Sequence, residues 1–162
     1  GQSAVTLKMA EFLRKNPDAS IEHIKKEADF WISRSRCAFF PGDLDYLRAG
    51  GRVSNAAYIG ATILGLKPLI EILDGKLVGT KKYRGSRDKV CKKFLTEYLK
   101  ENALEKESIY FLFSQGLDPQ LMKELENIAA EMGYPSVLWV ETGCTISTHA
   151  GPGAFGVGGF VL

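Results

Sequence analysis

The sequence predicts an α/β fold in which helices cover a mixed β-sheet of about six strands. Between residues 86 and 141, segments with helical spacing alternate with short apolar segments, a pattern typical of strand–helix–strand units. In addition, Asp74-Gly75 joins two strand-like segments, and this dipeptide is the strongest short-range indication of an antiparallel hairpin. Parallel and antiparallel neighbours together predict a mixed sheet.

Length and composition indicate one domain spanning residues 1–162, long enough to bury a substantial core. The chain is 45% hydrophobic and 25% charged, with a net charge of +2, so its basic excess is too small to indicate nucleic-acid binding. No apolar segment reaches the roughly 18 residues that would predict a membrane span. The three cysteines form no CxxC pair, so we expect no metal site and a reducing, cytoplasmic compartment.

Two helices and a strand are predicted before residue 41. The first helix covers residues 4–15 and ends at Asn16-Pro17, because proline cannot continue it. Ser20 caps a second helix that extends to about residue 32. Its apolar stripe predicts a buried face and contains Ile21, Ile24, Ala28 and Trp31. The apolar segment 37–40 predicts a strand that ends at Pro41.

The next two helices lie on either side of a glycine pair. Asp43 caps a short helix over 44–49, and Gly50-Gly51 ends it, with Gly51 expected at positive φ. Ser54 then caps a helix over 55–64 that is apolar nearly all round. Such a helix is either buried in the core or lines a cavity.

The predicted hairpin is followed by three more elements and a closing segment. Its strands cover 66–72 and 77–83, and Pro68 makes the pairing of the first strand's beginning uncertain. The basic cluster 81–87 is either a docking patch for an acidic partner or a solvated loop. The later predicted elements are a helix capped by Ser86 to about 100, a strand over 108–113, a helix over 118–132 that begins at Asp118-Pro119, and a strand over 136–141.

The last sixteen residues are rich in glycine and contain one of the two histidines, His149. Gly151-Pro152-Gly153 can form a turn whose free N–H groups converge on an anion, with His149 as a further donor. The same residues are also compatible with an ordinary turn before a closing strand. The residues alone leave both interpretations open.

Motifs of catalysis and of nucleotide binding are absent from the sequence. It contains no GxSxG, GxxxxGK[ST] or HExxH, and the glycines at 153, 156 and 158 precede no helix that could complete a dinucleotide site. The two histidines are far apart in sequence, and we find no nucleophile–base pair. We therefore expect a binding protein without a cofactor rather than an enzyme.

Five motifs, in order along the chain, resemble the DegV family of bacterial proteins. They are Asp43-Leu-Asp-Tyr-Leu-Arg-Ala-Gly-Gly-Arg-Val-Ser54, Leu66-Lys-Pro-Leu-Ile70, Asp74-Gly75-Lys76, Arg84-Gly85 and His149-Ala-Gly-Pro-Gly153. Together they span nearly the whole chain at spacings similar to those of the family.

The resemblance implies a fatty-acid-binding protein of two domains that presents the acyl carboxylate of a long-chain fatty acid to a separate fatty acid kinase. This chain resembles the C-terminal α/β domain. By position, Arg52 and His149 match residues around the carboxylate, beside the turn with Gly151 and Gly153. Arg84 matches a residue implicated in docking the kinase. Helix 55–64, with Ile59 and Ile63, and the strands beside it match the wall around the acyl chain.

The family's N-terminal domain, which carries Ser and Thr hydroxyls that hold the carboxylate, has no counterpart in this chain. His149-Ala150 also replaces the family's commoner His-Thr. Two other functions stay open: a regulatory or interaction domain that binds a small anion such as a phosphorylated metabolite, and an enzyme subunit completed by the second domain. A long apolar cavity would favour lipid, whereas a shallow polar pocket at the glycine-rich turn would favour a metabolite.

Overall fold

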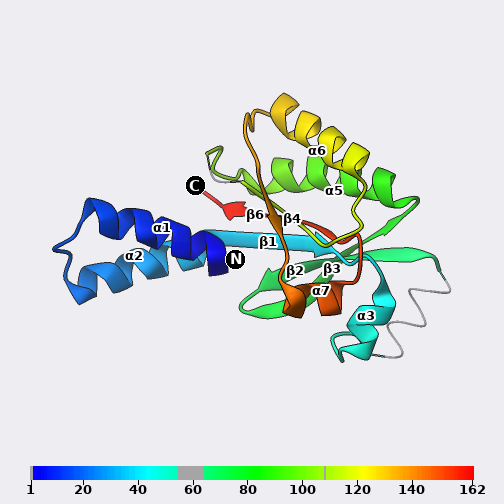
Figure 1. Ribbon diagram of the computed structural model, residues 1–162, viewed down its shortest axis with the longest axis horizontal. Helices are drawn as coiled ribbons and strands as arrows, with labels where there is room; N and C mark the ends of the chain where they lie inside the picture. The colour runs from blue at the N-terminus through cyan, green and yellow to red at the C-terminus, as the bar shows by residue number, and fades with distance from the viewer. Residues whose placement is uncertain (1, 55–63, 108) are drawn as a thin grey trace.

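The computed structural model describes residues 2–54, 64–107 and 109–162. Six helices and six strands lie in the described part of the chain (Figure 1). The helices are α1 (Gln2–Lys15), α2 (Ile21–Arg34), α3 (Leu44–Ala49), α5 (Arg87–Asn102), α6 (Pro119–Glu131) and α7 (Cys144–Ala150). The strands are β1 (Ser35–Phe40), β2 (Leu66–Leu73), β3 (Lys76–Arg84), β4 (Tyr110–Phe113), β5 (Leu138–Glu141) and β6 (Phe155–Phe160).

The strands form one six-stranded mixed sheet in the order β3-β2-β1-β6-β4-β5. Only the β4–β5 pair is parallel among the pairs of this sheet, because α6 provides the crossover between these two strands. β6, the last strand in sequence, lies in the middle and pairs antiparallel with both β1 and β4. The predicted α/β class and mixed sheet are confirmed.

Local sequence sets the beginnings of the helices as predicted. The side chain of Ser20 accepts a hydrogen bond from the N–H of His23, and Asp43 and Asp118 accept one from the residue two positions later. Each cap satisfies a backbone donor that the first turn of a helix leaves unpaired. Ser86 precedes α5 without a side-chain cap bond. The helices predicted within the described residues start within two residues of their observed positions, whereas the helix predicted over 55–64 lies outside the described residues apart from its end.

The hairpin between β2 and β3 has the expected turn. Asp74 has φ 49° and Gly75 has φ 73°, as the two central residues of a type I′ turn require. Only Ile70 and Glu71 of β2 pair with β1, so Pro68 lies beyond the part of β2 that is paired on both sides. Its missing N–H therefore interrupts no ladder toward β1.

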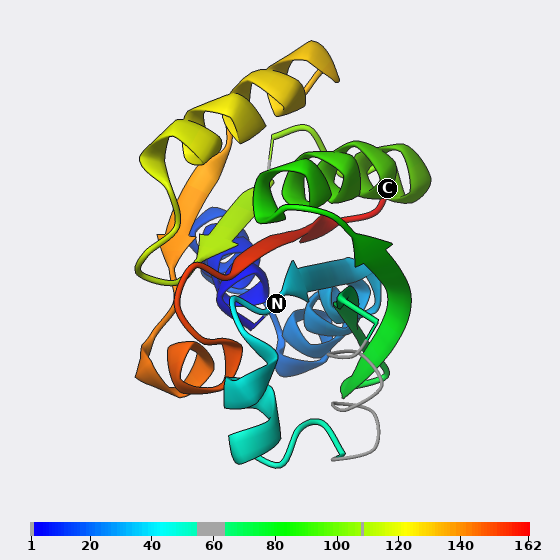
Figure 2. The same ribbon diagram turned by 90° about the vertical axis from the view of Figure 1, so that its right-hand side faces the viewer.

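The main core lies between the sheet and the pair α5 and α6, which cover one face (Figures 1 and 2). Phe94 and Leu95 of α5 and Leu125 of α6 face this core, each with 0% exposure. They pack against Phe111 and Phe155 of the sheet. α3 and α7 lie on the opposite face, where the sheet is less completely covered.

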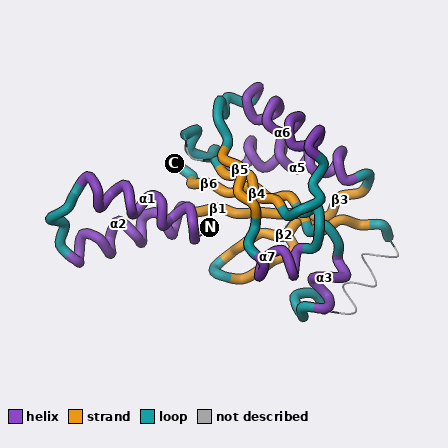
Figure 3. Tube along the Cα trace, viewed as in Figure 1, coloured by secondary structure: helices purple, strands orange, loops and turns teal. Residues whose placement is uncertain are grey.

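The α1–α2 pair extends beyond one end of the sheet instead of covering it (Figure 3). The stripe predicted for α2 is therefore only half-buried: Ile24, Ala28 and Trp31 have intermediate exposure, Ile21 is 66% exposed, and no residue of the helix is fully buried. Contacts between this pair and the rest of the fold include the ammonium of Lys8, which lies 2.6 Å from a Glu105 carboxylate oxygen, and the ring of Trp31, whose centre lies 5.0 Å from that of Phe160 in β6. Periodicity indicated a helix here but not what it would contact.

Two further observations complete the fold. α7 was not predicted, because its sequence consists mostly of β-branched, hydroxyl-bearing and other weak helix formers. In the described ranges, every helix is too short or too polar to cross the bilayer.

Candidate functional site

The end of α3 positions the predicted ligand residue Arg52. Gly51 has φ 69°, as expected for the residue that ends this helix, and it turns the chain so that Arg52 folds back. The Arg52 N–H donates to the Leu47 carbonyl (2.8 Å), and its guanidinium donates to the Gly50 carbonyl (2.5 Å). Arg52 is thereby held against the end of α3.

His149 lies in the last turn of α7, on the other side of Gly50. A Cβ atom built on Gly50 would lie 2.1 Å from Nδ1 of His149, so any larger residue at position 50 would force the imidazole to move. Nδ1 is buried and has no hydrogen-bond partner among the described residues. The structure therefore brings Arg52 and His149 together around Gly50.

The Gly151-Pro152-Gly153 turn differs from the predicted anion site. The Gly151 N–H donates to the Ser147 carbonyl (2.9 Å), and the Gly153 N–H donates to the Gln115 carbonyl (2.9 Å). The expected group of free amides is therefore not present at these two glycines. Both residues have positive φ, 76° and 71°, so they shape the turn after α7.

Ser114, which was not recognised from the sequence, holds this turn in place. It is 1% exposed, and its hydroxyl donates to the Gly151 carbonyl (2.6 Å) and accepts from the Ala154 N–H (2.8 Å). A lone serine at the end of a strand carries no distinctive pattern. Its role depends on the end of β4 meeting the turn between α7 and β6.

A cavity of about 470 Å³ lies beside Arg52, on the face of the sheet opposite α5 and α6. Most of its described wall is apolar and comes from α3, β2 and β3, with Arg52 between α3 and β2. The described lining residues are Leu44, Leu47, Arg52, Val53, Ser54, Leu64, Leu66, Pro68, Ile70, Leu77, Gly79 and Lys82. Two sequence patterns could have located this cavity. They are the i, i+3 spacing of Leu44 and Leu47 and the alternation of Leu66, Pro68 and Ile70.

Ile59 and Ile63, the predicted wall residues, lie outside the described residues.

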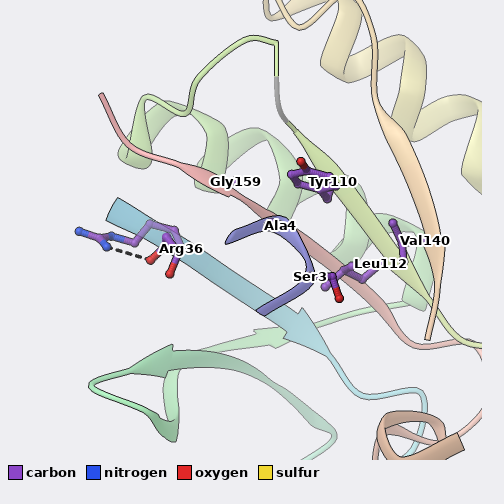
Figure 4. Close-up of a pocket in the computed structure, with 9 residues that line it drawn as sticks. Ser3, Ala4, Arg36, Tyr110, Leu112, Val140 and Gly159 are labelled. Atoms are coloured by element: carbon purple, nitrogen blue, oxygen red, sulfur yellow. Dashed lines mark hydrogen bonds between the residues drawn. The ribbon is translucent and has the colours of Figure 1, made fainter. Parts of the chain in front are cut away.

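A second hollow, of about 50 Å³, lies between the first turn of α1 and the strands (Figure 4). Ala4, Tyr110 and Leu112 are among its lining residues. Its volume accommodates about a water molecule or two, whereas the larger cavity is in the 300–1,000 Å³ range of ligand sites.

The basic cluster 81–87 is not a solvated loop, because residues up to Arg84 belong to β3 and three of its cations have partners within the chain. Lys81 pairs with Glu101 (2.5 Å), and the Arg84 guanidinium donates to the Leu64 carbonyl (2.8 Å) beside the cavity. Arg87 donates to the Gly42 carbonyl (2.6 Å) and so ties α5 to the loop before α3. Arg84 is exposed, at the opposite end of the cavity-lining strands from the hairpin turn.

Two of the three free cysteines are packed in the interior, whereas Cys144 is exposed. Cys37 and Cys91 are buried free thiols, and burial raises the pKa of Cys37 above its ordinary value and that of Cys91 to about 12. Both are therefore neutral near pH 7 and poorly nucleophilic. Within the described ranges, no three His, Cys, Asp or Glu side chains are grouped as metal ligands.

Comparison with known protein families assigns the chain. The sequence model of the DegV family, described as a family of uncharacterised proteins, matches residues 1–161. The chain belongs to the DegV family. The match extends over all the motifs from Asp43 to Gly153 on which the sequence resemblance rested.

Individual DegV proteins give the same assignment. Protein DegV of Bacillus subtilis is 31% identical over 160 residues, which are 96% of this chain and 55% of that protein. The crystal structure of a fatty-acid-binding DegV family protein from Streptococcus agalactiae is 26% identical, with a TM-score of 0.82 over 99% of this chain and 56% of that one. That of DegV, a fatty-acid-binding protein from B. subtilis, is 28% identical, with a TM-score of 0.71 over 98% of this chain and 56% of that one. This chain thus spans about half the length of these relatives.

Proposed function

We propose that this chain is a fatty-acid-binding domain that holds an acyl chain in the cavity between α3 and the β2–β3 hairpin. The observation that carries the proposal is an apolar cavity of about 470 Å³ with a guanidinium at its wall. The S. agalactiae and B. subtilis relatives, which share its fold, are fatty-acid-binding proteins.

Burial of the acyl chain supplies the affinity. Each methylene removed from water contributes about 0.8 kcal/mol, so a sixteen-carbon chain contributes on the order of 10 kcal/mol if it is fully covered. The wall that α3, β2 and β3 provide suits such a ligand, because it combines many apolar side chains with few polar groups.

The carboxylate end is proposed to lie toward Arg52 and His149. A carboxylate in an apolar cavity is costly to bury unless charged or polar donors compensate it. Arg52 offers a charge-assisted hydrogen bond, and the unpaired Nδ1 of His149 marks a place where a further polar partner is needed. Gly151 and Gly153 would contribute by holding the α7 turn, since their amides already have partners.

The main alternative, a domain for a phosphorylated metabolite, has less support. It requires a shallow polar pocket with free amides at the glycine-rich turn, and the amides of Gly151 and Gly153 are paired within the chain. An enzyme subunit would require an acid–base pair, which the sequence motifs do not indicate. We propose presentation of a ligand rather than its conversion.

We also propose the partners that this role needs. The chain would act as the second α/β domain of a two-domain protein, whose first domain supplies further carboxylate ligands and covers the site. A fatty acid kinase would receive the presented carboxylate near Arg84. The free thiols Cys37, Cys91 and Cys144 support a reducing, cytoplasmic location.

Native mass spectrometry of the full-length protein purified from cells tests the proposal. We expect a bound mass that corresponds to a fatty acid, and we expect Arg52→Gln to weaken its retention 10- to 100-fold through loss of a charge-assisted bond. Arg48→Gln is the matched control, because Arg48 lies on α3, pairs with Asp45 and is not among the described residues that line the cavity.

The outcomes are distinct. A fatty acid that is lost from the Arg52 variant but kept by the Arg48 variant supports the proposal. A phosphorylated metabolite in place of the lipid would favour the alternative function. Full-length protein that neither copurifies with a fatty acid nor takes one up from solution would contradict lipid binding.

A further inference from the structure

Gly79 occupies an unusual position, in the interior of strand β3 and on the wall of the cavity. Glycine weakens a strand interior, since it adds backbone freedom to the unfolded chain and has no side chain to pack. A glycine there therefore calls for a physical reason.

The usual structural reasons do not apply to Gly79. Its φ is not among the positive values of the chain, so its backbone does not require glycine. A Cβ atom built on it meets no described atom within 4 Å, whereas one on Gly156 would lie 2.8 Å from the Cβ of Phe39. The β2–β3 ladder shifts register next to Gly79, where Thr80 is the extra residue of a bulge. A bulge requires glycine only at a position with left-handed geometry, and Gly79 does not have it.

A side chain at position 79 would point into the cavity. Gly79 is the cross-strand partner of Ile70, and partners in an antiparallel pair share a face. Leu77, two residues earlier, points to the same face because side chains alternate along a strand. Ile70 and Leu77 both line the cavity, so the missing side chain leaves space within it.

We propose that Gly79 determines how long an acyl chain the cavity accepts. Gly79, which is exposed, leaves the cavity wall beside Ile70 and Leu77 without a side chain, and the end of the acyl chain lies against it. The inference rests on the proposed function, because it assigns a length preference to the same lipid site. The substrate class that follows is the longer straight-chain fatty acids, whose terminal methylenes need this space.

Competition among saturated fatty acids of different lengths tests Gly79. The full-length protein is loaded from an equimolar mixture of ten- to eighteen-carbon acids, and the retained acids are quantified. Each methylene excluded from the cavity lowers affinity about fourfold, so a leucine that excludes two of them shifts the long-to-short ratio by about 15-fold. We expect this shift for Gly79→Leu and a smaller one in the same direction for Gly79→Ala.

Val78→Leu is the matched control, since Val78 is the neighbouring residue on the opposite face of the same strand and is 37% exposed. It should keep the wild-type ratio. A folded Gly79→Leu protein with the wild-type ratio would overturn the inference while leaving lipid binding intact. If wild-type and Val78→Leu proteins retain no acid at all, the proposed function itself fails, and the inference falls with it.

Discussion

At the scale of single residues, the site depends on two adjacent glycines that are needed for different reasons. Gly51 has positive φ, and a Cβ atom on it would meet no described atom within 4 Å. Gly50 has an ordinary φ of −79°, but a Cβ atom on it would collide with His149. Gly51 turns the chain toward Arg52, and Gly50 leaves room for the imidazole.

The two glycines make separable predictions. Gly50→Ala should displace the His149 ring and lower the free energy of unfolding by about 1–3 kcal/mol through overpacking. Gly51→Ala should cost about 1–2 kcal/mol through backbone strain and leave the ring in place. Denaturant unfolding measures both costs, and imidazole NMR resonances report the ring position, with the exposed His23 as internal reference. Unchanged His149 resonances in Gly50→Ala would contradict the proposed contact.

At the scale of elements, three segments far apart in sequence meet at the turn between α7 and β6. Ser114 from the end of β4 bonds to both sides of this turn, and the Gly42 N–H before α3 donates to the Ala150 carbonyl (2.7 Å). α3 and α7 are therefore positioned by the same junction. The relative placement of Arg52 and His149 follows from it.

Removal of the Ser114 hydroxyl should weaken this junction. Ser114→Ala leaves the Gly151 carbonyl and the Ala154 N–H without this partner in a buried site, so we expect a loss of about 1–3 kcal/mol in the free energy of unfolding. Ser33→Ala is the control, because its hydroxyl makes a comparable bond to a carbonyl (2.9 Å) at an exposed position. It should change stability by less than about 0.5 kcal/mol. Equal effects of the two changes in urea unfolding would argue against a special role for Ser114.

At the scale of the whole molecule, the two faces of the sheet differ in packing and in proposed role. One face is closed by α5 and α6 over a continuous aromatic and aliphatic core. The other carries the cavity, with α3 near Arg52 and the exposed Arg84 near Leu64. Stability is concentrated on the first face, and the proposed binding and presentation take place on the second.

Arg84→Glu tests the proposed docking of the kinase. Reversal of an exposed charge at an interface mainly slows association, so we expect phosphorylation of the bound acid to fall about tenfold while lipid loading and unfolding change little. Lys89→Glu alters the net charge equally at an exposed position on the first turn of α5 and should have a smaller effect. Kinase turnover that is the same for wild type and Arg84→Glu would remove the assignment.

The sequence by itself determined most of the local structure. Ser20, Asp43 and Asp118 cap their helices, Asp74-Gly75 forms the hairpin turn, and Gly51 has positive φ, because each depends on a few neighbouring residues. Arg52 and His149 were also proposed as ligand residues from motifs, and both lie beside Gly50 in the fold. The mixed α/β sheet followed from the same local patterns.

Only the tertiary structure decided where these elements meet. β6 contains three glycines and becomes a central strand because β1 and β4 pair with it on both sides, so its structure depends on distant partners. α7 has little helix propensity and is held by contacts with α3 and Ser114. The cavity, the pairing of the turn amides and the collision that excludes a Cβ atom at Gly50 all arise between segments remote in sequence. No local pattern encodes such contacts, since they depend on how the packed sheet brings separate loops together.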